Sequence, residues 1–294
     1  MIHASGDAWR SARRKQIVIY GMSGLGKTHI SNILRKSGAW FHYSVDYRIG
    51  TRYMGEYIVD NFKKKAMKVP FLAELLRSDS IDISSNIRFD NLEPLSTYIG
   101  KPGDPAKGGI PFDEFMIRQG QHLQAEIDAM GETEHFSRRA KDIYDYDCFI
   151  CDTSGSLIEV VDPHDTEDPV ISKLFRVMLP VWIKGSDTHI QMLIDRFCRD
   201  PKPMYYQPDF ARALWDEFLA MERCSPETAD PDQFIRWGYE RLLAYRIPKY
   251  TALAENWGVT ITADDVSRVR HTDDFVDIIA DAIDRLVQPG RPGA

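Results

Sequence analysis

A run of eight residues near the start of the chain has the residue types and spacing needed to bind phosphate. It reads Gly-Met-Ser-Gly-Leu-Gly-Lys-Thr and fits the pattern G-x-x-x-x-G-K-[S/T] at each fixed position. Glycines allow a curl that turns successive backbone N–H groups towards phosphate oxygens, and a following helix adds the positive end of its dipole. We therefore expect contacts with phosphate from this run and the residue after it: Gly21, Met22, Ser23, Gly24, Leu25, Gly26, Lys27, Thr28 and His29.

Two side chains of this run would act on the phosphates directly. Lys27 supplies a mobile positive charge that can reach the β- and γ-phosphates of a nucleotide, and the Thr28 hydroxyl can bind Mg²⁺. The surroundings favour this interpretation over a chance match, because an apolar run at residues 16–20 precedes the loop and a helical pattern at residues 28–35 follows it. The sequence therefore predicts a site for ATP and Mg²⁺ in which Lys27 is catalytic.

Such a site also needs an acid that orients the magnesium ion or activates the attacking oxygen, and two aspartates are candidates. Asp152 ends the apolar run at residues 148–151 and precedes a small polar turn, and Asp46 follows the apolar run at residues 40–45. Carboxyl ends of parallel strands meet at one edge of a sheet, so both carboxylates would face the phosphates. We expect Asp152 to bind Mg²⁺ and Asp46 to compete for the magnesium or the acceptor hydroxyl. Helix capping is the structural alternative for each.

A parallel sheet is needed to position these residues. Apolar runs at residues 178–184 and 258–262 predict a fourth and a fifth strand, and helical patterns lie between the strands, such as those at residues 49–64 and 273–286. Strands that alternate with helices are typical of a three-layer α/β fold with a parallel sheet. The sequence therefore predicts the α/β class.

The alternation of strands and helices is interrupted between residues 65 and 147. Helical patterns at residues 71–77 and 112–130 are separated there by a loop rich in glycine and proline at residues 100–111. We therefore predict a nucleotide-binding core, formed by residues 1–64 and 148–294, with an inserted and mainly helical region at residues 65–147. This insertion would bind the acceptor or a protein partner.

Composition limits the partners of the chain. Its 294 residues carry 37 Lys and Arg against 44 Asp and Glu, a formal net charge of -7, which argues against nucleic acid as the main partner. No segment approaches the roughly 18 apolar residues of a membrane span, and residues 1–15 lack the apolar stretch of a secretory signal. We therefore expect a cytoplasmic protein without a membrane partner.

The cysteines do not indicate a metal or redox site. Cys148 and Cys151 form a C-x-x-C pattern, but they lie in a run that we interpret as a buried strand. Residues three apart in a strand point to opposite faces, whereas a redox pair normally begins a helix. We therefore interpret them as core residues and expect neither zinc nor a disulfide.

Several segments, taken in order, resemble shikimate kinase and its relatives in the P-loop NTPase superfamily. They are the glycine loop, Asp46, the third strand with its polar turn, and a late segment in which Arg246, Tyr250 and Ala254 keep the family's R-x-x-x-Y-x-x-x-A spacing before the last strand. The resemblance covers residues 16–52, 148–199 and 246–286. It implies a kinase that transfers the γ-phosphate of ATP to a small molecule.

The resemblance also implies roles for individual residues. An anionic acceptor would be bound by Arg246, with Asp46, Arg52 and Gly155 as further contacts. The family closes an arginine-bearing lid over ATP after its fourth strand, and Arg196 and Arg199 occupy the corresponding place. Either arginine would neutralise charge on the transferring phosphate.

The chain departs from the family at two positions, and a second function stays open. One of the family's paired acids is missing in Ser44-Val45-Asp46, and its triple-glycine turn appears as Thr153-Ser154-Gly155, so shikimate is not the expected acceptor. A P-loop ATPase or nucleotide-dependent switch that binds a macromolecule through residues 65–147 would also fit the loop. A GTPase is less favoured, because the guanine-binding N-K-x-D pattern is missing after the fourth strand.

Overall fold

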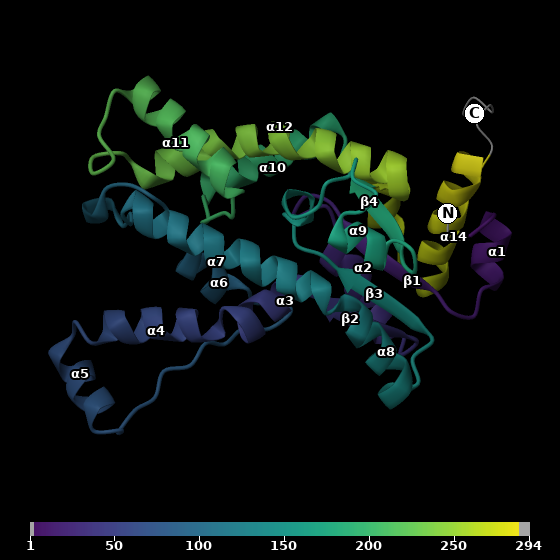
Figure 1. The fold of residues 1–294 in the computed structure, drawn as a ribbon, viewed down its shortest axis with the longest axis horizontal. Helices are drawn as coiled ribbons and strands as arrows, with labels where there is room; N and C mark the ends of the chain where they lie inside the picture. The colour runs from purple at the N-terminus through teal and green to yellow at the C-terminus, as the bar shows by residue number, and fades with distance from the viewer. Residues whose placement is uncertain (1–2, 288–294) are drawn as a thin grey trace. The chain divides into compact units, whose positions relative to one another are not determined.

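The computed structural model describes residues 3–287, which form two compact units (Figure 1). Unit 1 contains the described parts of residues 1–45, 130–199 and 241–294, and unit 2 contains residues 46–129 and 200–240. Residues 1–2 and 288–294, which the predicted core also includes, lie outside the described residues. The boundaries differ from those predicted, since unit 2 includes residues 46–64 and 200–240 beside most of the predicted insertion.

Unit 1 is built on a five-stranded sheet in which all neighbouring strands are parallel. The strand order is β2-β3-β1-β4-β5. The predicted α/β class with a parallel sheet is therefore confirmed. The strands are β1 (Gln16–Tyr20), β2 (Trp40–Ser44), β3 (Cys148–Asp152), β4 (Leu179–Lys184) and β5 (Val259–Thr262).

Strand β1 lies at the centre of this sheet and is buried on both faces. Ile17, Val18 and Ile19 are all 0% exposed, which explains why the strand is apolar without alternation. The chain goes from β1 to β2 on one side, returns to β3, and then crosses to β4 on the other side of β1. Open α/β sheets bind ligands at the carboxyl ends of the strands where the order reverses in this way.

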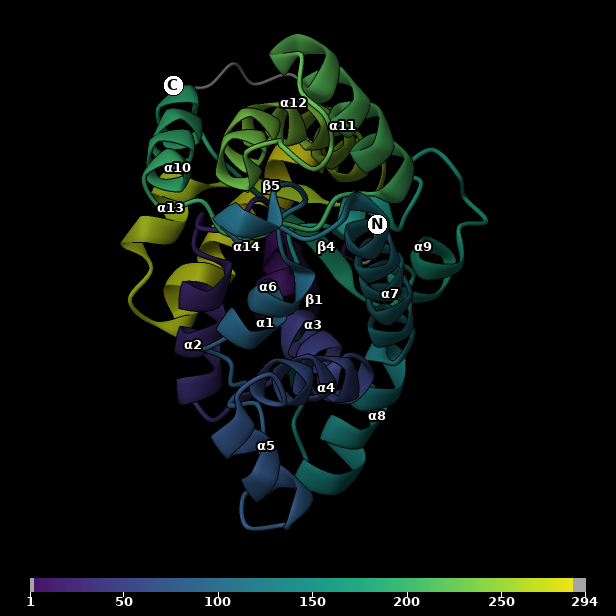
Figure 2. The same ribbon diagram turned by 90° about the vertical axis from the view of Figure 1, so that its left-hand side faces the viewer.

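Helices cover both faces of the sheet. Helices α2 and α14 contact each other, as do α8 and α9, and Figure 2 shows the two pairs on opposite sides of the strands. Helix α2 buries Ile30 and Leu34, one turn apart, and exposes Thr28 and His29. The helices of unit 1 are α1 (Gly6–Ser11), α2 (Lys27–Lys36), α8 (Thr133–Tyr144), α9 (Pro169–Leu174), α10 (Asp187–Arg199), α13 (Ala263–Arg268) and α14 (Thr272–Val287), with a 3-10 turn at Leu157–Glu159.

Unit 2 is helical and has an aromatic core. The Trp215 ring stacks on Phe112 with centroids 5.0 Å apart and meets Phe234 edge-on at 4.9 Å. The chain passes between the units within α7 and α12. The helices that lie wholly or partly in unit 2 are α3 (Val45–Arg48), α4 (Gly55–Ala66), α5 (Pro70–Arg77), α6 (Glu93–Ile99), α7 (Phe112–Gly131), α11 (Pro208–Glu222) and α12 (Pro231–Trp257), with a 3-10 turn at Pro105–Lys107.

The predicted helix at residues 49–64 is interrupted in the structure. A π-helical turn at Ile49–Tyr53 comes first, and the Met54 N–H donates to the Ile49 carbonyl at 2.8 Å, five residues back. Helix α4 begins only at Gly55. Among residues 3–287, no helix combines the length and apolarity that crossing a membrane requires.

Candidate functional site

The loop between β1 and α2 is tightly curled at the carboxyl end of the central strand. Gly21, Gly24 and Gly26 have φ values of 136°, 93° and 104°, in the region that favours glycine. A Cβ at Gly21 would lie 2.8 Å from the Ile183 carbonyl oxygen of β4, and one at Gly26 would lie 2.5 Å from Val266 Cγ1. Both the backbone conformation and the close packing of the loop therefore require glycine.

This curl leaves backbone N–H groups without acceptors. Within residues 3–287, the amides of Ser23, Gly24 and Gly26 donate no hydrogen bond, and Ser23 and Gly24 are exposed. Helix α2 starts directly after Gly26 with no side-chain cap and no acidic residue in its first turn. Because the first N–H groups of a helix and its dipole attract anions, the loop has the properties of an anion-binding site.

Lys27 places its ammonium group inside the curl of the loop. The side chain is largely buried, and Nζ donates to the carbonyl oxygens of Gly21 at 2.7 Å and Met22 at 3.3 Å. A phosphate in the loop would offer this ammonium a charged acceptor, with which hydrogen bonds are about twice as strong as with a neutral one. Thr28 and His29 follow on the exposed first turn of α2.

Asp152 lies at the end of β3, beside the strand that leads into the loop. The register pairs it with Ile19 of β1 on one side and with Ser44 of β2 on the other. Its Oδ2 lies 3.5 Å from Nε2 of His42, and the two side chains are 8% and 1% exposed. Thr153 donates to the Ile19 carbonyl through both its N–H and its hydroxyl, which ties the polar turn to β1.

The polar turn after β3 lies between the loop and the final part of α12. A Cβ at Gly155 would lie 3.6 Å from Arg246 Nη1 and 3.7 Å from the Ser23 nitrogen, so one residue separates the arginine from the loop. The Tyr250 hydroxyl donates to the Gly155 carbonyl. Arg246 and Tyr250 are both buried, on one helical face, because residues four apart in a helix are neighbours.

Arg246 forms a buried ion pair that the sequence did not predict. Its Nε contacts Oε1 of Glu159, and the two side chains are 3% and 0% exposed. Glu159 belongs to a 3-10 turn after the polar turn and carries no motif. His42 was missed for a similar reason, since its only signal is a polar residue within an apolar strand.

Arg196 and Arg199 lie beside the loop on α10. Together with Gly24 and Leu25 they line a cleft of about 230 Å³. A Cβ at Gly24 would lie 2.4 Å from Arg196 Nη2, so this guanidinium packs directly against the loop. The Arg199 Nε donates to the Asp195 carbonyl of the same helix at 3.3 Å.

Two predicted contact residues belong to unit 2 rather than to unit 1. Asp46 is the second residue of α3, and Arg52 lies in the π-helical turn with an exposed side chain. Unit 1 by itself therefore brings together the loop, Asp152, Gly155, Arg246 and both α10 arginines, but neither Asp46 nor Arg52.

The cysteines and possible metal ligands are arranged without a dedicated metal cluster. In the described part of the chain, no three His, Cys, Asp or Glu residues are grouped so that they could hold a metal ion. The four cysteines are free thiols, and burial raises the pKa of the Cys151 thiol far above its ordinary value. Mg²⁺ needs no such cluster, because it usually takes one or two protein ligands together with substrate phosphates and water.

No known protein family matches the chain, and no curated protein sequence is significantly similar to it.

Proposed function

We propose that the chain binds ATP with Mg²⁺ on the loop from Gly21 to Thr28 and transfers the γ-phosphate to an anionic small molecule. The loop's unpaired amides, the uncapped start of α2 and the Lys27 ammonium are the observation that carries the proposal. All three attract anions, and they converge at the edge of the sheet where open α/β folds bind ligands.

The loop would act on the nucleotide through its backbone and Lys27. Amides of Ser23 and Gly24 would donate to phosphate oxygens, and Lys27 would exchange its carbonyl acceptors for the β- and γ-phosphates. The oxygen donors of Thr28 and Asp152 suit Mg²⁺, which prefers hard oxygen ligands and neutralises charge on the phosphates.

Arg196 would stabilise the phosphoryl group during transfer. Its guanidinium packs against Gly24, whose amide is one of the proposed phosphate donors. A fixed positive charge at that place stabilises the transition state most, because negative charge then shifts between the bridging and the attacking oxygen. Arg199 lines the same cleft and is the second candidate for this role.

Arg246 would bind the acceptor, with Gly155 beside it. Its charge is already offset by Glu159. Arg246 would therefore contribute directed N–H donors to a carboxylate or phosphate rather than net positive charge. The close approach of Gly155 to both Arg246 and Ser23 supports a short distance between acceptor and nucleotide.

Transfer of label from [γ-³²P]ATP tests the proposal. The full chain is incubated with labelled ATP, Mg²⁺ and fractionated pools of small metabolites, with Lys27→Ala as the inactive control. A labelled small molecule that requires Lys27 supports the kinase. Free phosphate alone supports the alternative, a P-loop ATPase or switch, whereas no binding of ATP to the folded chain would exclude both.

A further inference from the structure

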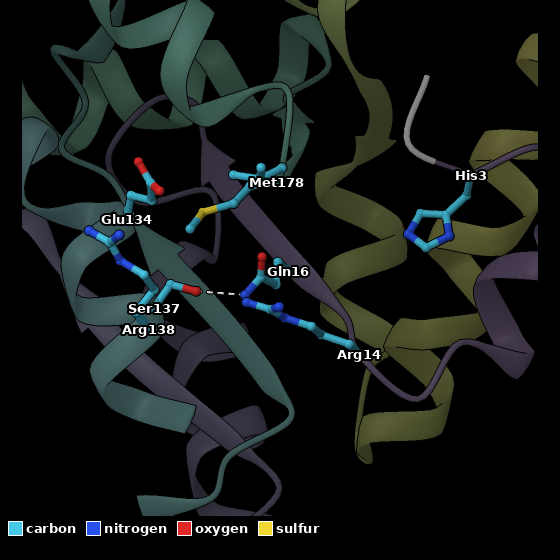
Figure 3. Close-up of a pocket in the computed structure, with 8 residues that line it drawn as sticks. His3, Arg14, Gln16, Glu134, Ser137, Arg138 and Met178 are labelled. Carbon is cyan, nitrogen blue, oxygen red and sulfur yellow. Dashed lines mark hydrogen bonds between the residues drawn. The ribbon is translucent and has the colours of Figure 1, made fainter. Parts of the chain in front are cut away.

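A second cavity in unit 1 lies at the end of the sheet opposite to the proposed phosphate loop, Gly21 to Thr28. Its volume is about 450 Å³, within the range of small-molecule sites. Gln16 begins β1 here, whereas the phosphate loop follows the other end of that strand. The lining residues that matter here are Arg14, Gln16, Glu134, Ser137, Arg138 and Met178 (Figure 3). None of them has a role in the proposed phosphotransfer.

Arg14 is held at this cavity by Gln16. With the Gln16 amide oxygen facing Arg14, that oxygen accepts from Arg14 Nη2 at 2.7 Å, from Arg14 Nε at 3.0 Å and from Ser137 Oγ at 2.6 Å. The amide nitrogen then donates to the Val177 carbonyl at 3.3 Å. Figure 3 draws the Gln16 amide in the other orientation, with the same contact to Ser137 made by the amide nitrogen. Three of the five guanidinium N–H groups of Arg14 remain for a ligand.

Arg138 brings a second guanidinium to the cavity from helix α8. Across residues 3–287 it forms no ion pair and donates no hydrogen bond. Glu134, one turn earlier on the same helix, is also without a salt bridge there. His3 also lines the cavity. Burial and, to a smaller extent, Lys15 lower the pKa of His3, so its ring stays neutral at pH 7. The charged groups that line the cavity are thus the guanidinium groups of Arg14 and Arg138 and the carboxylate of Glu134.

We propose that this cavity binds a small metabolite through an anionic group held by Arg14 and Arg138. Arginine suits this task because its planar fork donates two parallel hydrogen bonds to a phosphate or carboxylate. Glu134 accepts a hydrogen bond from a hydroxyl or amino group of the same ligand, and Val177, which lines the cavity and is exposed, offers an apolar contact to its carbon atoms. The site is independent of the proposed function of the phosphate loop.

The sequence provides a matched control for each arginine. Arg13 precedes Arg14 but contacts Asp147 at 2.8 Å on the surface, and Arg139 follows Arg138 on α8; neither lines the cavity. The test titrates inorganic phosphate, and in parallel succinate, into the full chain carrying Lys27→Ala, so that the phosphate loop contributes little. Arginine Nε–Hε signals and backbone amides in ¹H–¹⁵N spectra report the dissociation constant.

We expect saturable shifts at Arg14, Ser137 and Arg138 with at least one probe, and the probe that saturates identifies the preferred group. Arg14→Gln and Arg138→Gln should each weaken binding at least about tenfold, as expected for a lost charged hydrogen bond. Arg13→Gln and Arg139→Gln should change it less than about twofold. Equal weakening by all four variants, or no saturation with either probe, would overturn the proposal. Arg138→Gln removes no hydrogen bond or ion pair within the described residues, so we expect this variant to fold.

Discussion

Lys27→Ala should greatly weaken the binding of ATP and change the stability of the chain only slightly. The variant loses the ammonium that we propose to bridge two phosphates, and each charge-assisted hydrogen bond contributes about 1.5–3 kcal/mol. A loss of about 3 kcal/mol raises the dissociation constant of ATP on the order of a hundredfold. Stability should change by only about 1 kcal/mol, because the lost bonds to Gly21 and Met22 are offset by no longer burying a charge.

Thermal unfolding with and without MgATP measures both effects. At a hundred times its dissociation constant, ATP stabilises a protein by about 2.7 kcal/mol. For a chain of 294 residues this is a rise in Tm of roughly 4–5 °C, because the entropy of unfolding is about 2.1 cal/mol/K per residue. At the same ATP concentration the Tm of Lys27→Ala should rise by only about 1 °C. Lys36→Ala, at the exposed end of the same helix, should behave like the unmodified chain. An undiminished rise in Lys27→Ala would refute the role of this lysine.

Four further outcomes follow from the same geometry. Asp152→Asn should retain ATP binding but lose most of its Mg²⁺ dependence in a calorimetric titration; the same loss in Asp46→Asn alone would reverse the two assignments. Arg196→Gln should lower kcat for transfer and hydrolysis at least about tenfold and change the affinity for ATP little. An unchanged kcat with a raised ATP KM in steady-state kinetics would contradict this role. Arg246→Lys should raise the acceptor KM and leave the ATP KM unchanged, whereas a raised ATP KM would place this residue on the nucleotide. Burial holds the pKa of Cys151 far above the unfolded value of 9.0, so its thiol should stay protonated and resist iodoacetamide at pH 8. The folded state should also lose stability as the pH rises above 9. Labelling of Cys151 itself in the folded chain, located by peptide mass spectrometry, would contradict this, whereas labelling of the partly exposed Cys148, Cys198 or Cys224 would not.

The strands of unit 1 were predictable because their environment is simple. β1 and β3 have the predicted bounds, since both are buried on two faces and are limited by glycine or polar residues. β2 was expected to include Val45, but this residue begins α3. An apolar residue at the end of a strand fits a buried helical turn equally well, so the pattern alone does not locate this boundary.

The site contains one part that the sequence predicts, the glycine loop, and one part that it does not predict, the ion pair of Arg246. Spacing alone predicted the glycine loop from Gly21 to Thr28, because each fixed position of the motif has a local backbone or charge requirement. The Glu159 partner of Arg246 could not be found in this way. The two residues are 87 positions apart, and only the packing of α12 against the polar turn brings them together.

By itself, the sequence determined the α/β class, the place of the glycine-rich pattern between a strand and a helix, and the buried character of Cys151, because these depend on hydrophobic pattern and local conformation. Only the tertiary structure decided which segments form unit 2. Residues 200–240 join residues 46–129 through contacts such as Lys101 with Asp232 and Phe112 with Trp215, more than a hundred residues apart in sequence. Helix periodicity shows that a helix has an apolar face, but it does not show which distant helix covers that face.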